Sequence, residues 1–133
     1  MKKLTFIFTL LVSITMFSLP SYAEWKEVTK NVRGTTFYVD IERIRKHDGY
    51  VYFWRLSDYL KPNSAGSFSG IIYLQVDCKL FRYKYLSDTY YTGPMGTGQN
   101  NGGSNIPDKN WSYPNPNSAS EAILKKVCSY WVL

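Results

Sequence analysis

The strongest constraint on the fold is the placement of the two cysteines, Cys78 and Cys128. Cys78 ends a segment in which aliphatic side chains alternate with more polar ones, so the sequence predicts a strand that turns this cysteine toward the core. Cys128 lies in a segment whose apolar residues recur at spacings of three and four, which is typical of an amphipathic helix. Two cysteines allow one pairing, and that pairing would join the helix to a sheet.

The beginning of the chain has the pattern of an export signal. Lys2 and Lys3 precede an apolar run, and small residues up to Ala23 fit the site that a signal peptidase cuts. We therefore predict a signal peptide over residues 1–23 and one small domain over residues 24–133, because about 110 residues do not suffice for two domains. The apolar run is shorter than the roughly 20 residues of a membrane-spanning helix and is diluted by serine and threonine, so we expect no membrane anchor in the mature form.

Export also decides the chemistry of the cysteines, because thiols pair and stay paired in an oxidising compartment. Closing a loop of about 50 residues stabilises a fold by on the order of 4 kcal/mol in the chain-entropy model. A redox role is disfavoured, since catalytic pairs usually lie in a Cys-x-x-Cys arrangement and these two cysteines are far apart. The sequence predicts a structural disulfide between Cys78 and Cys128.

The predicted fold class is α+β: a small antiparallel β-sheet of about five or six strands, with a C-terminal helix packed on it through the disulfide. The candidate strands are rich in aromatic and β-branched side chains, which suit a pleated, half-buried surface. They cover residues 25–28, 35–39, 50–60, 71–78 and 81–85. Asp40 is predicted to start a single helical turn. Ser118 and Glu121 form a capping box that starts the C-terminal helix. The apolar stripe of this helix consists of Leu124, Val127, Cys128 and Trp131.

Residues 50–60 carry the longest aromatic run. Both faces of this predicted strand are largely apolar, which indicates either a central strand covered on each side or a face that meets a partner instead of solvent. We therefore regard four of its aromatic residues as candidate partner-binding residues: Tyr50, Tyr52 and Trp54 on one face and Tyr59 on the other.

Basic and aromatic residues alternate in a later strand, where Arg82 and Lys84 lie between Phe81, Tyr83 and Tyr85. A nucleic-acid platform needs both kinds of side chain on one surface, whereas the pleat of a strand turns them to opposite faces. We therefore expect the aromatic residues in the core, the two cations at the surface as candidate partner contacts, and no nucleic-acid partner. Loss of the two lysines of the export signal lowers the formal net charge from +6 to +4, so a weak preference for anionic surfaces stays open.

Residues 92–117 contain most of the glycine and proline of the mature chain. A loop of this length inside a small domain is usually functional or mobile. The amides of its glycine-rich segment could cradle a phosphate, but a nucleotide loop needs Gly-Lys-Ser/Thr at the start of a helix. We expect instead a turn-rich loop, whose candidate partner contacts are Gly93, Pro94, Met95, Gly96, Thr97 and Gly98. Trp111 and Tyr113 are expected to pin the second half of the loop.

The composition disfavours most catalytic and metal sites. One histidine and two cysteines cannot build a metal cluster or an iron–sulfur centre, and no nucleophile motif accompanies His47. We expect no enzymatic activity, no metal and no cofactor. One hydrolytic alternative stays open, in which Asp58 and Asp77 on neighbouring strands act as a pair of carboxylates.

Six segments follow one another along the chain: Phe37-Tyr38-Val39-Asp40-Ile41-Glu42-Arg43-Ile44-Arg45, Asp58-Tyr59, Val76-Asp77-Cys78, Tyr91-Thr92-Gly93-Pro94-Met95-Gly96-Thr97-Gly98, Trp111 and the helix from Ser118 to Cys128. With them the chain resembles the bacterial surface-adhesin protein E family over nearly all of its mature length. The resemblance implies a small antiparallel sheet with a disulfide-linked C-terminal helix and no enzymatic activity. For the namesake of the family it implies adhesion to host extracellular-matrix proteins and self-association.

The chain departs from that namesake in one respect. The namesake is a surface lipoprotein, whereas Glu24 and Trp25 follow Ala23 here and no cysteine at this point is available for a lipid. We therefore expect an exported protein that is periplasmic, with secretion or surface association as the alternatives.

Three hypotheses follow for the function. The leading one is a non-enzymatic binding module whose aromatic face and glycine-rich loop contact a protein partner, either host extracellular matrix or a second copy of the chain in a homodimer. The alternative is a periplasmic protein of envelope maintenance in which both aromatic faces belong to the core. The third is a hydrolase that uses Asp58 or Asp77.

Overall fold

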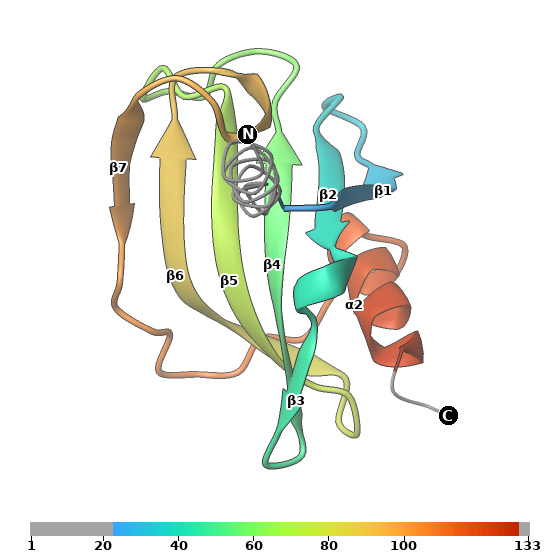
Figure 1. Cartoon of the computed structure of the whole chain (residues 1–133). Coiled ribbons are helices and arrows are strands. Elements are labelled where there is room, and N and C mark those ends of the chain that lie inside the picture. Colours follow the sequence, from blue (N-terminus) through green and yellow to red (C-terminus); the bar gives the residue numbers. More distant parts are fainter. Residues whose placement is uncertain (1–22, 131–133) are drawn as a thin grey trace, which may run out of the picture.

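The computed structural model describes residues 23–130, so the predicted signal peptide, apart from Ala23, and Trp131 of the predicted helix stripe lie outside the described residues. The described part is one antiparallel sheet of seven strands with a C-terminal helix (Figure 1). The strands are β1 (Trp25–Lys30), β2 (Thr36–Asp40), β3 (Arg45–His47), β4 (Tyr50–Asp58), β5 (Ser69–Asp77), β6 (Arg82–Tyr91) and β7 (Asn100–Ser104). Their order across the sheet is β1-β2-β4-β5-β6-β7, and β3 pairs with β4. The predicted fold class is confirmed.

The hairpin of β4 and β5 forms the centre of the sheet. One face of this hairpin is apolar and buried, as the alternating pattern predicts, through Val51, Phe53, Leu74 and Val76. The turn between the two strands is held by Asn63, whose Oδ1 accepts hydrogen bonds from the amides of Ala65 (3.1 Å) and Ser67 (2.9 Å). Such asparagine turns satisfy the backbone without a partner strand, so the hairpin closes locally.

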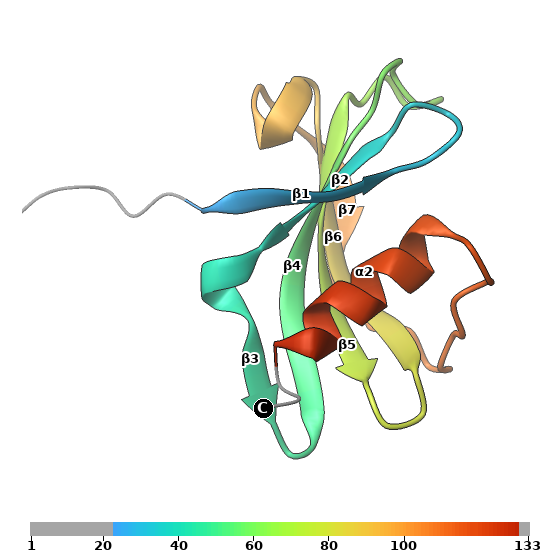
Figure 2. The same cartoon turned by 90° about the vertical axis from the view of Figure 1, so that its right-hand side faces the viewer.

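The core lies between the sheet and helix α2 (Ala119–Ser129), which crosses one side of the sheet (Figure 2). We call this side the helix face. Its buried residues are Val39, Ile44, Val51, Phe53, Ile72, Leu74, Val76, Ile123, Leu124 and Val127. Cys78, directly after β5, and Cys128, in α2, form a disulfide with a Cα–Cα distance of 5.7 Å, so the predicted bridge is confirmed.

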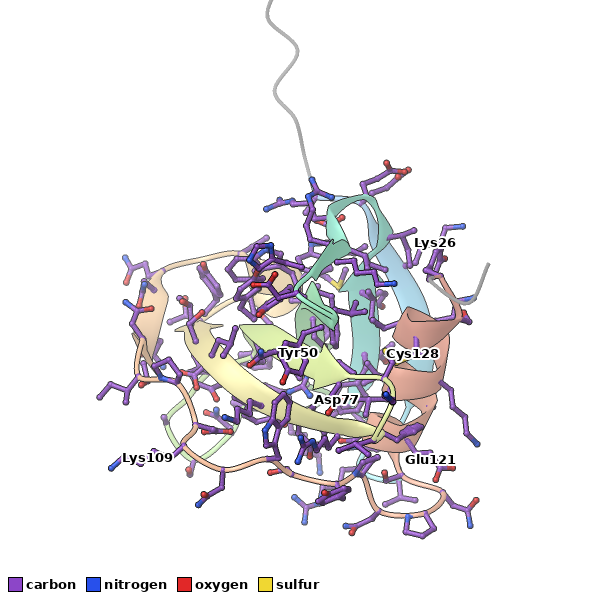
Figure 3. The ribbon with its side chains drawn as sticks, turned by 90° about the horizontal axis from the view of Figure 1, so that it is seen from below. Lys26, Tyr50, Asp77, Lys109, Glu121 and Cys128 are labelled. Carbon is purple, nitrogen blue, oxygen red and sulfur yellow. A yellow bond between two sulfur atoms is a disulfide. The ribbon has the colours of Figure 1, made fainter. Side chains whose placement is uncertain are left out.

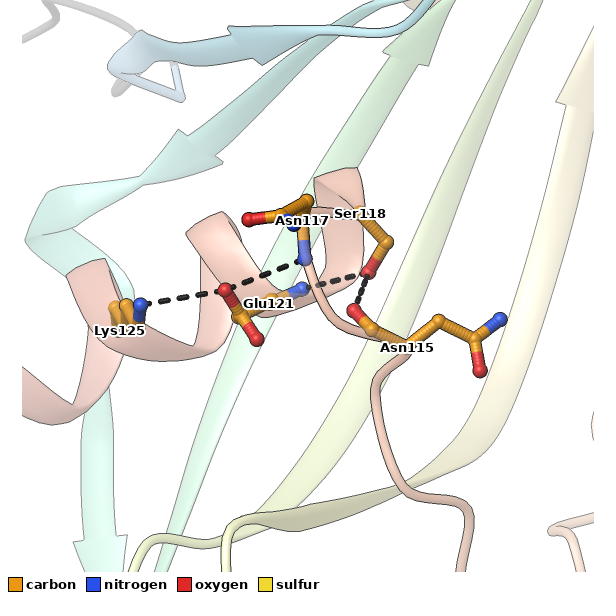
Figure 4. Close-up of polar contacts among 5 residues, drawn as sticks. All are labelled: Asn115, Asn117, Ser118, Glu121 and Lys125. Atoms are coloured by element: carbon orange, nitrogen blue, oxygen red, sulfur yellow. Dashed lines mark hydrogen bonds and ion pairs between the residues drawn. The ribbon is translucent and has the colours of Figure 1, made fainter.

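Helix α2 begins with the predicted capping box (Figure 4). The Ser118 Oγ accepts a hydrogen bond from the amide of Glu121 (3.2 Å), and the Glu121 carboxylate accepts one from the amide of Asn117 (3.4 Å). The same carboxylate forms an ion pair with Lys125 at 3.2 Å, four residues further along the helix. These contacts satisfy amide donors that the first turn of a helix leaves without partners, so the helix starts at this point.

Two strands of the sheet are absent from the sequence predictions. Strand β3 pairs with the start of β4 through a tight turn at Asp48 and Gly49, whose φ angles of 50° and 82° match the two-residue turns that join twisted strands. Strand β7 has the sequence Asn-Asn-Gly-Gly-Ser and pairs with β6. Neither strand has an alternating apolar pattern, because the side chains of both are largely exposed. These strands contribute backbone hydrogen bonds to the sheet without burying an apolar face.

The predicted helical turn after Asp40 is confirmed as the 3₁₀ turn η1 (Ile41–Arg43). The Asp40 side chain forms no capping hydrogen bond. Instead it is fully buried, and its Oδ2 lies 2.9 Å from the Nε of Arg43. Asp40 therefore occupies the N-cap position as predicted, but its carboxylate pairs with the Arg43 side chain instead of capping the turn.

Candidate functional site

The side of the sheet opposite α2 carries the aromatic residues of β4. Val51 and Phe53 are buried in the helix face, and alternation along the strand turns Tyr50, Tyr52 and Trp54 to the other side, where they are half-buried. We call this side the open face. It is formed by Tyr50, Tyr52, Trp54, Tyr73, Gln75, Arg82 and Lys84, from β4, β5 and β6. One of the two apolar faces of β4 is thus covered, and the other is partly accessible.

Aromatic rings of neighbouring strands contact one another on the open face. Tyr73 of β5 lies between Tyr52 (6.1 Å between ring centroids) and Trp54 (4.5 Å) of β4. The Tyr52 hydroxyl accepts a hydrogen bond from the Gln75 side-chain amide at 3.1 Å. Burial, followed by the neighbouring Tyr52, raises the pKa of Tyr73 above its ordinary value. These side chains form a preorganised aromatic row, since each ring is held by the next.

The two cations of β6 lie on the same face as this row. The Trp111 ring has the guanidinium carbon of Arg82 at 4.6 Å and the ammonium of Lys84 at 4.7 Å from its centroid. Tyr50 contacts the same indole, with 5.5 Å between the ring centroids. The backbone on either side of Trp111 is attached to β6 by two hydrogen bonds of 2.9 Å between Tyr83 and Ser112. Trp111 therefore pins the second half of the loop as predicted, and Tyr113, although 62% exposed, also interacts with Arg82.

This arrangement corrects one sequence inference. Within β6 the prediction is right, because Tyr83 and Tyr85 pack toward the helix face. The inference that basic and aromatic side chains are therefore separated is wrong, because Trp111 and the aromatic residues of β4 bring rings to the face of Arg82 and Lys84. The cations cover an indole instead of extending freely into solvent. The contact between these cations and the indole depends on how segments far apart in the chain pair, so the local sequence pattern does not predict it.

The carboxylate beside the cations of the open face is engaged. Asp77 accepts hydrogen bonds from the Arg82 Nε (3.0 Å) and the Leu80 amide (3.2 Å). Burial opposes ionisation of this carboxyl group, but these hydrogen bonds and the Arg82 charge outweigh it and hold the pKa of Asp77 below its ordinary value. Among residues 23–130, Lys84 forms no ion pair, so the open face keeps positive charge beside its aromatic rings.

The glycine-rich loop is folded tightly against the upper end of the open face. It contains the turn η2 (Pro94–Gly96), which lies on the side of the sheet opposite α2 (Figure 2). Its amides are used internally: the Met95 amide donates to the Asp58 carboxylate (2.8 Å) and the Gly96 amide to the Ser69 Oγ (2.8 Å). Gly96 has a φ of +73°, and a Cβ there would lie 2.9 Å from the Ile71 side chain. The glycines serve close packing on the sheet, and the engaged amides are not available to a phosphate.

Asp58 and Asp77 do not form a pair. Asp58 lies opposite Ser69 in the pairing of β4 with β5, and Asp77 stands at the other end of β5. A strand of that length separates them by about 26 Å, since each residue advances roughly 3.3 Å. Two hydrolytic carboxylates need about 5–10 Å, so this geometry does not support the hydrolase hypothesis. Residues 23–130 contain no cluster of three His, Cys, Asp or Glu side chains placed to hold a metal ion.

Tyr59 does not join the open face. Side chains two residues apart in a strand share a face, so Tyr59 lies on the same side as Arg55 and Ser57. These two residues point to the helix side of the sheet. Burial, followed by the neighbouring Tyr90, raises the pKa of the Tyr59 hydroxyl. The candidate partner-binding residues therefore lie on two different sides of the sheet. Within residues 23–130, no helix has the length and apolar character that crossing a bilayer requires.

Comparisons with known proteins agree with this architecture. The structure of Haemophilus influenzae protein E superposes with a TM-score of 0.64 at 15% sequence identity, covering 86% of this chain and 90% of that one. Crystal form II of the same protein superposes with a TM-score of 0.62 at 16% sequence identity, covering 86% of this chain and 94% of that one. Protein E from non-typeable Haemophilus influenzae superposes with a TM-score of 0.61 at 16% sequence identity, covering 84% of this chain and 80% of that one. At these identities the likeness shows a shared fold.

No curated protein matches the chain in sequence. The model of the surface-adhesin protein E family, in contrast, matches residues 25–129, which is all but the edges of the described structure. The chain therefore belongs to the surface-adhesin protein E family.

Proposed function

We propose that this chain is an exported, non-enzymatic binding protein whose open face docks a protein partner. The observation that carries the proposal is the row of half-buried aromatic rings on that face, from Tyr50 to Trp54, next to the cations of β6. Aromatic residues and arginine are enriched at protein interfaces, where rigid rings bury a large area at a small entropic cost. The rings here are already held by their neighbours, which lowers the cost of binding further.

The chemistry of the face indicates what kind of partner fits. Lys84 has no carboxylate partner among the described residues, so a partner with acidic side chains would complement it. A cavity of about 390 Å³ opens beside Trp54 and is lined by Trp25, Ile71 and Met95 among others, so it can take an apolar side chain of the partner. The glycine-rich loop forms one wall of this cavity, so it would contribute to the same contact.

The family suggests which partners to test first. Its description as a surface adhesin supports host extracellular-matrix proteins as partners, and a second copy of the chain is the other candidate. A periplasmic maintenance role would not need an accessible aromatic face. We propose that the mature protein begins after Ala23 and is periplasmic, or else released or surface-associated, without a lipid anchor. Cell fractionation with mass spectrometry of the mature N-terminus tests the export part separately.

The binding test uses residues 24–133 with the disulfide formed and a panel of immobilised matrix proteins such as collagen, fibronectin and laminin. We expect saturable binding that Trp54→Ala and Lys84→Ala each weaken by about tenfold, as for central interface residues. Val32→Ser is the matched control, because Val32 is a fully exposed apolar residue in the turn between β1 and β2. Sedimentation equilibrium of the same variants tests the second copy as partner. A monomer that binds none of these proteins, or binding that ignores both open-face variants, would contradict the proposal.

A further inference from the structure

A separate cavity of about 640 Å³ lies on the helix side of the sheet, between the turn that joins β1 to β2 and the turn that joins β4 to β5. We call it the Arg55 pocket. Its polar lining includes Arg33, Arg55, Ser57, Tyr59 and Lys61. Both turns meet at the top of the molecule in Figure 1, where α2 does not cover the sheet. The open face and its partner-binding residues lie on the opposite side of the sheet.

Arg55 is the unusual residue of this pocket. Arg55 is only 8% exposed, and an arginine buried to this degree is normally paired with a carboxylate. Its guanidinium lies over the rings of Phe37 (5.5 Å) and Tyr85 (5.2 Å), and one Nη donates a weak hydrogen bond of 3.3 Å to the Tyr85 hydroxyl. The buried Nε has no acceptor. Arg55 forms no ion pair with any described residue. This includes Asp88, which lies two strands away: Arg55 of β4 pairs with Ile72 of β5, and Ile72 pairs with Asp88 of β6.

Ser57 is a second unsatisfied group on the same wall. It stands two residues after Arg55 on the same side of β4 and is 2% exposed, and its Oγ has no hydrogen-bond partner. A buried hydroxyl and a buried guanidinium N–H without acceptors each cost free energy in a folded protein. Both residues line the same cavity, so a turn of their side chains toward it would let an acceptor from outside the chain complete them.

The charge of the pocket agrees with an anionic acceptor. Arg33 and Lys61 stand at its rim, one on each turn, and no aspartate or glutamate of the described chain lines it. The two turns are held in place by asparagine side chains: Asn31 Oδ1 accepts hydrogen bonds of 3.0 Å from the amides of Arg33 and Thr35. Asn63 does the same in the other turn. The rim cations are therefore carried by ordered turns and attract an anion toward Arg55.

We propose that the Arg55 pocket binds an oxyanion, the carboxylate or phosphate group of a small organic molecule. On binding, the Arg55 and Ser57 side chains turn toward the cavity, so that the anion accepts hydrogen bonds from the Arg55 guanidinium and the Ser57 Oγ. Arg33 and Lys61 balance its charge from the rim. The apolar remainder of the molecule lies against Phe37 and Leu60, which also line the cavity. A bare inorganic anion fills only a part of about 640 Å³, so an organic body adds affinity through buried apolar area.

The experiment follows the Arg55 Nε–H signal of ¹⁵N-labelled, disulfide-bonded residues 24–133 by NMR, with the salt concentration balanced by chloride. The probes are inorganic phosphate, phenyl phosphate, acetate and benzoate. We expect saturable shifts of this signal, tighter binding of each aromatic probe than of its bare counterpart, and a higher melting temperature with phenyl phosphate. Tighter binding of the phosphates than of the carboxylates identifies a phosphorylated ligand, and the reverse order identifies a carboxylic acid. Absence of a saturable shift with all four probes would overturn the proposal.

The variants separate a built site from general charge attraction. Ser57→Ala should weaken phenyl phosphate binding by about three- to tenfold, the range of one hydrogen bond. Arg55→Met should weaken it by about tenfold or more, with isothermal calorimetry as the readout. Lys109→Ala is the control, because it also removes one charge and Figure 3 shows Lys109 on a loop at the side of the molecule away from α2. If Arg55→Met does not fold, Ser57→Ala and Lys61→Ala decide the question. Equal effects of Lys61→Ala and Lys109→Ala, with none from Ser57→Ala, would refute the site.

The two proposals fail independently. Trp54→Ala should leave phenyl phosphate binding unchanged, because Trp54 and the Arg55 pocket lie on opposite sides of the sheet. Loss of phenyl phosphate binding in this folded variant would overturn the assignment of the anion to the Arg55 pocket.

Discussion

The guanidinium group of Arg82 stacks on the indole of Trp111, with 4.6 Å between the guanidinium carbon and the ring centroid. The two residues come from different parts of the chain, Arg82 from the start of β6 and Trp111 from the long connection between β7 and α2. Asp77 also holds this guanidinium, with its Oδ2 at 3.0 Å from the Arg82 Nε (Figure 3 shows Asp77 beside Tyr50). This contact closes the lower end of the open face and ties the connection to the sheet.

Replacement of Trp111 by alanine should destabilise the protein by about 2 kcal/mol. A half-buried tryptophan loses less than the 3–5 kcal/mol of a fully buried one, and two cation–π contacts are lost with it. Urea denaturation followed by circular dichroism measures the change. Ile106→Ala is the control, because Ile106 is 81% exposed in the same connection and its replacement should cost less than about 0.5 kcal/mol. Equal losses for both variants would show that the stack contributes nothing specific.

The glycine-rich loop should loosen when its contact with Asp58 is removed. Asp58→Ala leaves the Met95 amide without its acceptor, and a hydrogen bond to a charged group contributes about 1.5–3 kcal/mol. We expect faster hydrogen exchange at the amides of Met95 and Gly96 and unchanged exchange in the centre of β4 and β5. Asp58→Asn keeps an acceptor and should show a smaller effect. Exchange that rises equally throughout the sheet would mean that Asp58 stabilises the whole fold instead of the loop.

Stability should fall in acid partly through Asp77. The pKa of this carboxyl group is lower in the folded protein than in the unfolded chain, so the folded state is favoured wherever the unfolded group is ionised. That contribution is present above about pH 4 and is lost as the pH falls through the lower folded pKa. Asp77→Asn should therefore flatten the dependence of the unfolding free energy on pH below about 4. Arg82→Gln, which removes the partner cation at 3.0 Å, should flatten the slope in the same direction. An identical slope in the wild type and Asp77→Asn would contradict the role of Asp77.

The disulfide should supply a large share of the total stability. Replacing both Cys78 and Cys128 by alanine removes a link that closes a loop of 50 residues, and the expected loss is about 2–5 kcal/mol. Chemical denaturation of the double variant, with and without reductant, measures the change. Reductant should destabilise the wild type and leave the double variant unaffected. Two free thiols in the native, exported protein, detected by alkylation and mass spectrometry, would remove the basis of this prediction.

The strands and the helix with a clear apolar period follow from the sequence alone. In β4, β5 and α2 the spacing of buried residues is set by neighbours within one element, and Ser118 with Glu121 fixes the start of the helix locally. The disulfide also follows, because an exported chain with two cysteines has one pairing. Strands β3 and β7 were not predictable in this way, since they bury no apolar face and exist through hydrogen bonds to β4 and β6.

The surfaces were decided by tertiary structure. The sequence identified the aromatic residues of β4 as partner-binding candidates on two faces, but the position of α2 determines that Tyr52 stays accessible while Phe53 is buried. In the same way, the register of β4, β5 and β6 places Trp111 under Arg82, and the two turns above the sheet leave Arg55 buried without a carboxylate. The physical reason is that periodicity encodes which side of a strand a residue takes, whereas the contacts across strands depend on residues far apart in the chain.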